Sequence, residues 1–327
     1  MTREAGAKFG PRHIQGRETT MTDTSIGTPE QLRDPNYTPG LHKAIPLGIQ
    51  HVLAMFVSNI TPAIIISGAA GFGFGSAAGA QGFPDMTYLI QMSMLFAGIA
   101  TLFQTIGAGP VGARLPIVQG TSFAFIPIMI PLVQTVDDAG NIVGKGPEAM
   151  AALLTGVLIG GLFHILLGTV IGKIRFALPP LVTGLVVTMI GLALVKVGIQ
   201  YAAGGVPKIN AEEYGSLLNW SAALVVVFVT LALKFYAKGM LAVSAVVIGI
   251  IVGYIYAFFM GMVVQPTGPD TFAVGADAIA VSWNRAAAFA FPIPFKYGFE
   301  ISFAAIVGFC LMAFVSAVET VGDVSGI

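Results

Sequence analysis

The sequence has 327 residues, of which 55% are hydrophobic and only 10% are charged, against roughly 25% charged residues in soluble domains. Its 16 Lys and Arg balance 16 Asp and Glu, so it lacks the basic excess of a nucleic-acid-binding domain. A single cysteine, Cys310, excludes a disulfide framework or a cysteine zinc site within one chain. These features predict an all-α polytopic membrane protein that binds no nucleic acid.

Residues 1–42 are polar, and the first apolar stretch after them is too long for the core of a signal peptide. We expect this segment to be a cytoplasmic N-terminal tail. Met21 is a second plausible start of translation. Residues 1–20 are therefore either part of the tail or a misassigned extension upstream of the real start.

Eight apolar segments are each long enough to cross a bilayer. They cover about residues 44–70, 86–108, 115–135, 148–172, 176–200, 216–236, 240–264 and 298–320. Basic residues gather on alternate loops, at Lys43, Arg114, Lys173, Arg175, Lys234 and Lys238. Because short cytoplasmic loops are rich in Lys and Arg, we place these loops and the N-terminus in the cytoplasm.

The first span carries a polar pair, Gln50 and His51, among apolar residues. One interpretation is a buried brace or proton-linked group beside a site, because histidine titrates near neutral pH. The other is an interfacial histidine that is satisfied by lipid headgroups or a carbonyl group. Asn59 and Pro62, further along the same span, predict a kink or break.

The third span has two prolines, Pro116 and Pro127, on either side of a Gly120-Thr121-Ser122-Phe123 core. Pro127 removes a helical hydrogen bond and biases Ile126 toward extended geometry. We therefore expect an extended segment followed by a half-helix, a feature typical of transporter binding sites. The alternative is a proline-kinked helix with no ligand.

The eighth span ends with two carboxylates, Glu319 and Asp323, which share one face of a helix at this spacing. A charge at the bilayer centre costs about 2.5–3.5 kcal/mol on insertion scales, so such residues usually face a protein interior and bind a substrate, an ion or a proton. The sequence therefore predicts part of a polar site near residue 319.

These motifs together resemble a known family. They are Gln50-His51, the run Gln119-Gly120-Thr121-Ser122-Phe123-Ala124-Phe125, Leu178-Pro179-Pro180, and Glu319-Thr320-Val321-Gly322-Asp323. Their order and spacing from about residue 40 to the end are similar to those of the nucleobase–ascorbate transporter family, which includes uracil, xanthine and uric acid permeases.

The resemblance implies about eight of the fourteen spans of an inverted seven-plus-seven repeat, with the third span partly an extended strand. It assigns residues 43–175 to core-domain spans one to four and 176–264 to gate-domain spans five to seven. Residues 265–297 become an extracellular loop, and 298–327 begin the second repeat with a core-domain span. The family's tenth span would lie beyond this sequence, so the chain is expected to supply part of the pocket.

The resemblance also implies roles for individual residues. Glu319 matches the carboxylate that binds the base, and Phe123 matches an aromatic position whose backbone N–H bonds a base carbonyl; Ser122 and Ala124 flank it. Asp323 occupies a position that tends to be aspartate in xanthine and urate permeases and histidine in uracil permeases. His51, with Gln50, corresponds to a pair that organises the site.

We therefore expect a symporter in the bacterial inner membrane, surrounded by lipid and able to form a homodimer. Its substrate would be xanthine or uric acid, with uracil as the alternative. It would be coupled to protons through Glu319 or Asp323, since a desolvated carboxylate binds a proton more readily, or else to sodium. No cofactor, metal or enzymatic activity is expected. The rival interpretations are an anion transporter or channel of similar fold, which would usually place a basic residue at the site, and a non-transporting fragment.

Overall fold

A computed structural model describes residues 34, 37–72, 79–107, 109, 111–115, 117–174, 180–267, 271–285 and 289–325. The expected tail before residue 34, Pro116 and the Leu178–Pro179 motif lie outside this range. The chain divides into two units, Met1–Leu47 and Gly48–Ile327. The second unit contains every contact described below.

Six helices in the described part of the chain are long and apolar enough to cross a membrane. They are α2 (Leu41–Ala69), α3 (Gly79–Ile106), α5 (Pro147–Ile174), α6 (Pro180–Ala202), α7 (Leu217–Tyr236) and α11 (Phe303–Ser325). They correspond to the predicted spans one, two, four, five, six and eight. The predicted polytopic membrane fold is confirmed.

The predicted seventh span differs in its details. It consists of α8 (Met240–Val243) and α9 (Ala245–Phe259), separated at Ser244, whose backbone is not helical. The helix stops well before residue 264 because Gly261 adopts a positive φ of 69°. The Met262 N–H then bonds the Ala257 carbonyl, and the Gly261 N–H bonds the Phe258 carbonyl. This is a glycine-based helix end that a residue with a side chain would strain.

The third predicted span is interrupted, as expected. Residues 117–122 form neither helix nor strand ladder, and Ser122 has extended angles. A 3₁₀ turn, η1 (Phe123–Phe125), and a short helix, α4 (Ile126–Val133), follow. The expectation for Ile126 was wrong, since its angles are helical (φ −54°, ψ −45°). Pro127 lies in the first turn of α4, where a missing N–H needs no partner.

Of the kink or break predicted at Asn59 and Pro62, the break does not occur, because α2 continues from Leu41 to Ala69 as one helix; the kink stays a prediction. Short extramembrane elements also interrupt the all-α pattern. Two antiparallel hairpins pair β1 (Gln134–Val136) with β2 (Ile142–Gly144), and β3 (Val264–Pro266) with β4 (Phe272–Val274). A helix, α10 (Ala276–Arg285), lies within the segment 265–297 that was expected to be only a loop.

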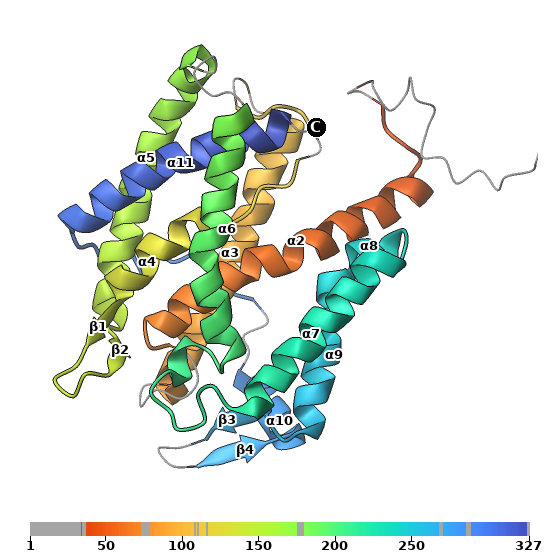
Figure 1. The fold of residues 1–327 in the computed structure, drawn as a ribbon. Coiled ribbons are helices and arrows are strands. Elements are labelled where there is room, and N and C mark those ends of the chain that lie inside the picture. The colour runs from red at the N-terminus through yellow and green to blue at the C-terminus, as the bar shows by residue number, and fades with distance from the viewer. Residues whose placement is uncertain are drawn as a thin grey trace, which may run out of the picture. The chain divides into compact units, whose positions relative to one another are not determined.

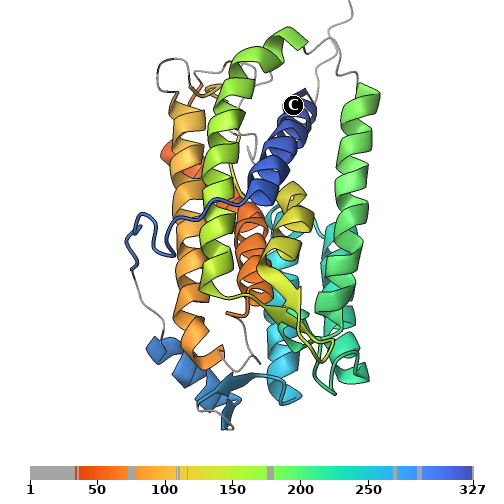
Figure 2. The same cartoon turned by 90° about the vertical axis from the view of Figure 1, so that its left-hand side faces the viewer.

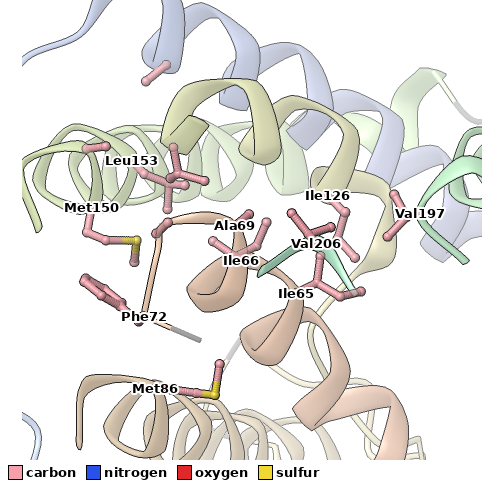
Figure 3. Close-up of a cluster of buried hydrophobic side chains, with 14 of the residues drawn as sticks. Ile65, Ile66, Ala69, Phe72, Met86, Ile126, Met150, Leu153, Val197 and Val206 are labelled. Carbon is pink, nitrogen blue, oxygen red and sulfur yellow. The ribbon is translucent and has the colours of Figure 1, made fainter. Parts of the chain in front are cut away.

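The buried core gathers where α2 ends. Ile65, Ile66 and Ala69 of α2 pack with Ile126 of α4 and Leu153 of α5 (Figure 3). Further buried members come from α3, α5, α6 and the 3₁₀ turn η3 (Val206–Lys208), namely Met86, Met150, Val197 and Val206. This cluster fixes the short helix α4 between the long helices, and so fixes the end of the extended segment.

Helices α5 and α11 have the most extensive contact between two helices in the described structure, and they lie side by side in both views (Figures 1 and 2). Two glycines on α5 allow this approach. A Cβ atom at Gly160 would lie 2.7 Å from the Cβ of Phe309, and one at Gly156 would lie 2.7 Å from its ring. Phe309 itself is buried and stacks on Phe125 of η1, with ring centroids 5.7 Å apart.

Helices α7 and α9 also lie side by side (Figure 1). A Cβ atom at Gly253 would overlap the side chain of Val226, and one at Gly249 would overlap that of Thr230. A hydrogen bond of 2.9 Å joins the hydroxyls of Ser221 and Tyr256. Small residues four apart are a typical means of close helix packing in membranes.

Lys296 connects the segment before α11 to the start of α3. Its Nζ lies 2.5 Å from Asp85 Oδ1 and 3.9 Å from the centroid of the Tyr88 ring. Tyr297 donates its hydroxyl to the same carboxylate (3.1 Å) and stacks on Phe72. Burial, together with the neighbouring Asp85 charge, raises the pKa of Tyr297 well above its ordinary value, so it stays neutral and remains a donor.

Replacing this cation by a methionine is expected to loosen the segment around residues 289–302. Lys296→Met removes a partly exposed ion pair, worth about 0–1 kcal/mol, and a cation–π contact, worth about 0.5–1 kcal/mol. Melting in detergent should fall by a few degrees, and proteolysis of this segment should become faster. Lys238→Met, at an exposed lysine with no partner among the described residues, is the control. Equal melting of both variants would contradict the contact.

Candidate functional site

The structure brings together two residues that lie 197 positions apart. The hydroxyl of Ser122, at the end of the extended segment, donates a hydrogen bond to Glu319 Oε2 of α11, at 3.0 Å. Both side chains are half-buried. A bond to a carboxylate is stronger than one between neutral groups, so this pair links the interrupted third span to the eighth span.

Ser122 has a second role in its own segment. It is the N-cap of η1, and its Oγ accepts the Ala124 N–H at 3.2 Å. A hydroxyl can accept and donate at the same time, so one side chain starts the turn and also reaches Glu319. The local sequence explains this geometry, because serine is a preferred N-cap residue.

The beginning of η1 presents a free donor at this point. The backbone N–H of Phe123, the first residue of the turn, has no hydrogen-bond partner among the described residues. The Phe123 ring packs against the core cluster, while Ala124 is buried. The site therefore contains a carboxylate acceptor on Glu319, a hydroxyl on Ser122 and a backbone N–H donor at Phe123.

Asp323 follows Glu319 by one helical turn on α11, where it is exposed. Between them, a Cβ atom at Gly322 would lie 3.1 Å from Thr183 Cβ of α6, so α11 approaches α6 closely here. The structure therefore leaves Asp323 near Glu319 along the helix, without a direct bond between the two carboxylates.

Gln50 and His51 are not connected to this pair by any hydrogen bond in the part of the chain that the structure describes. His51 is exposed and Gln50 is partly buried on α2. Their organising role stays a prediction.

The extended segment is held by side chains that the sequence did not single out for this purpose. Thr101 Oγ1 of α3 accepts the Gln119 N–H at 2.9 Å and lies 3.2 Å from the Gln119 carbonyl oxygen. Asn59 of α2, considered only as a cause of a kink, accepts the Thr121 N–H at 3.1 Å. These bonds satisfy backbone groups of residues 117–122, which form neither a helix nor a strand ladder.

Within the described ranges, no group of three or more His, Cys, Asp or Glu side chains is arranged to hold a metal ion. Six helices that are long and apolar enough to cross a membrane indicate an integral membrane protein, with a hydroxyl–carboxylate pair at an interrupted predicted span. Such sites, built at discontinuous spans, are typical of secondary transporters.

Comparison with known proteins agrees with this class. Residues 42–327 match the family model described as Permease family. A candidate purine permease of Clostridium perfringens is 33% identical over 287 residues, 88% of this chain and 55% of that protein. The xanthine permeases XanP and XanQ of Escherichia coli K12 are 32% and 30% identical, each covering 88% of this chain and 56% of the relative.

The chain therefore belongs to this permease family, and the resemblance to the nucleobase–ascorbate transporters is confirmed. It spans about half the length of the curated relatives that it matches.

Proposed function

We propose that this chain is part of a secondary active transporter for a nucleobase, with xanthine as the leading substrate. The observation that carries the proposal is the Ser122–Glu319 bond at the interrupted span. The names of the E. coli relatives, both xanthine permeases, support the substrate class.

The groups at this site suit the edge of an oxidised purine. Ring N–H groups of the base donate to the Glu319 carboxylate, and such charge-assisted bonds are roughly twice as strong as neutral ones. A ring carbonyl accepts from the free Phe123 N–H. The Ser122 hydroxyl donates to Glu319, and the Ala124 N–H donates to the Ser122 Oγ. The partner of Glu319 here is a hydroxyl rather than a basic side chain, which favours a base over a small anion.

Asp323 supports xanthine or uric acid over uracil. The family resemblance associates aspartate at this position with permeases for oxidised purines and histidine with those for uracil. A second acidic group one turn from Glu319 adds another acceptor for xanthine or uric acid, which have more ring N–H donors than uracil. Uracil remains the alternative substrate within the same family.

Proton symport is the proposed coupling, with sodium as the alternative ion. Glu319 takes up a proton in one step of the cycle and releases it in another, and the Ser122 hydroxyl can donate to the charged form or accept from the protonated form. His51 and Gln50 organise the site from α2. No cofactor takes part in this scheme.

Part of the packing supports the proposed division into core and gate domains, although α6, in segment 176–264, also contacts α11. Helix α11, in segment 298–327, has its most extensive contact with α5 in segment 43–175, whereas α7 packs on α9 within 176–264. Movement of these two groups against each other would expose the site alternately to the two sides. We place the protein in the bacterial inner membrane with a cytoplasmic N-terminus, and a homodimer is a proposal from the family.

Radiolabelled uptake tests the proposed function. Cells without their own purine and uracil permeases would express either the complete gene that encodes this chain or residues 1–327 alone. Xanthine, urate and uracil would each be supplied with and without a protonophore. We expect xanthine or urate uptake that the protonophore abolishes, and we expect it from the complete gene. Uptake of uracil alone would favour the alternative substrate. Absence of all uptake despite membrane insertion would contradict a nucleobase transporter.

A further inference from the structure

Asn59 is a buried polar side chain of α2, with 1% of its surface exposed. Its Oδ1 accepts the Thr121 N–H at 3.1 Å. Its backbone carbonyl accepts the Ser93 hydroxyl of α3 at 2.6 Å and lies 3.2 Å from the Thr121 hydroxyl. One residue therefore joins α2, α3 and the extended segment.

The extended segment also contacts a carbonyl group of α2 that Pro62 leaves without its usual helical donor. A proline has no N–H, so the carbonyl four residues before it, that of Ser58, has no helical donor. The Thr121 hydroxyl lies 3.3 Å from this Ser58 oxygen. The extended segment thus supplies a donor to a carbonyl that the proline leaves without its helical partner.

The approach of the two segments leaves no room for a side chain. A Cβ atom at Gly120 would overlap Asn59 Oδ1 and lie 3.0 Å from its Cγ. Glycine at 120 is therefore required for the Asn59 amide to reach the Thr121 N–H. The orientation of the amide follows as well, because the backbone N–H needs the oxygen, and Nδ2 is left without a partner among the described residues.

We infer that Asn59 is a positioning residue of the binding site, which acts through Thr121 on Ser122 and its bond to Glu319. Residue 122 follows directly after the residue that Asn59 holds. A shift of the Thr121 backbone therefore moves the Ser122 hydroxyl and the Phe123 N–H together. The nature of the ligand in this inference rests on the proposed function, whereas the placement of the segment does not.

Transport kinetics test the effect on the site. Asn59→Ala in the whole protein should raise the KM for xanthine about fivefold or more, the size of one lost hydrogen bond, while the maximal rate per inserted molecule changes less. Thr121→Val, which removes only the hydroxyl, should also raise the KM. It provides the test if Asn59→Ala fails to insert. Ser67→Ala is the matched control, because Ser67 is fully buried on the same helix but bonds only its own helix carbonyls.

Thiol labelling tests the placement without any transport. Cys310 is the only cysteine of residues 1–327, so Ser122→Cys in a background without Cys310 and without any cysteine encoded elsewhere in the complete gene provides a single reporter on the segment. Alkylation of this reporter by N-ethylmaleimide should change in rate by about threefold or more with Asn59→Ala, and stay unchanged with Ser67→Ala.

The two readouts separate the possible failures. Altered labelling with no nucleobase uptake in any variant would keep the positioning role and overturn the proposed substrate. Unchanged labelling and unchanged KM for both Asn59→Ala and Thr121→Val would overturn the positioning role.

Discussion

Glu319→Gln should abolish measurable nucleobase uptake while leaving the protein inserted in the membrane. The amide keeps the size of the side chain and an oxygen that can accept from Ser122, but it removes the negative charge and the site of proton binding. Hydrogen bonds to charged groups contribute about 1.5–3 kcal/mol, which corresponds to roughly 10- to 150-fold in affinity. Loss of proton uptake would add to this effect by stopping the coupled cycle.

Initial uptake rates of labelled xanthine, normalised to the amount of inserted protein, measure this result. Ser122→Ala serves as the graded companion, since it removes one neutral donor to Glu319 and one turn cap and should reduce uptake about tenfold or less. Full protonophore-sensitive uptake by Glu319→Gln would show that the carboxylate has no part in binding or coupling.

Gly160→Ala is expected to be strongly destabilising. The added Cβ would lie 2.7 Å from Phe309 Cβ and 3.2 Å from Phe309 backbone atoms, which cannot move independently of α11. Overpacking of this kind costs typically about 1–3 kcal/mol. Glu319 lies on α11, as Phe309 does, so a displacement of α11 should also weaken substrate binding at the Ser122–Glu319 pair.

The neighbouring glycine offers a matched control. Gly161 lies in the same helix, and a Cβ there would meet nothing within 4 Å. Gly161→Ala should be neutral or slightly stabilising, because alanine is favoured over glycine in helices by about 0.5–1 kcal/mol. Melting of the two variants in detergent, together with xanthine affinity, gives the comparison. Equal stability of both variants would rule out the close α5–α11 approach as the constraint.

The sequence was sufficient to predict the membrane-spanning helices and the interrupted third span. Long apolar runs can only be helical in lipid, and the Gly120-Thr121-Ser122 core disfavours a helix. The errors came from prolines. Pro62 was expected to kink or break α2, and only the break is contradicted, because the proline lies within a continuous helix. Pro127 was expected to extend Ile126 but lies in a first turn. Local rules state what a proline removes but not which distant group compensates for the loss.

The site was predicted only in part for the same reason. Glu319 and Ser122 each stood out as polar residues in apolar spans, yet their bond joins residues 197 apart and depends on how α11 packs on α5. Thr101 gave no signal in the sequence, and Asn59 was considered only as a cause of a kink or break. Their role arises from contact with a backbone 18 and 62 positions away.

Equilibrium binding of radiolabelled xanthine to the whole purified protein tests the central claim most directly, because it needs neither coupling nor a transport cycle. Wild type, Glu319→Gln and Lys238→Met would be compared at equal protein concentration. The structure predicts saturable binding by wild type and by Lys238→Met, and a loss of at least about tenfold in affinity for Glu319→Gln. Equal xanthine affinity in all three proteins would contradict a binding site at Ser122 and Glu319.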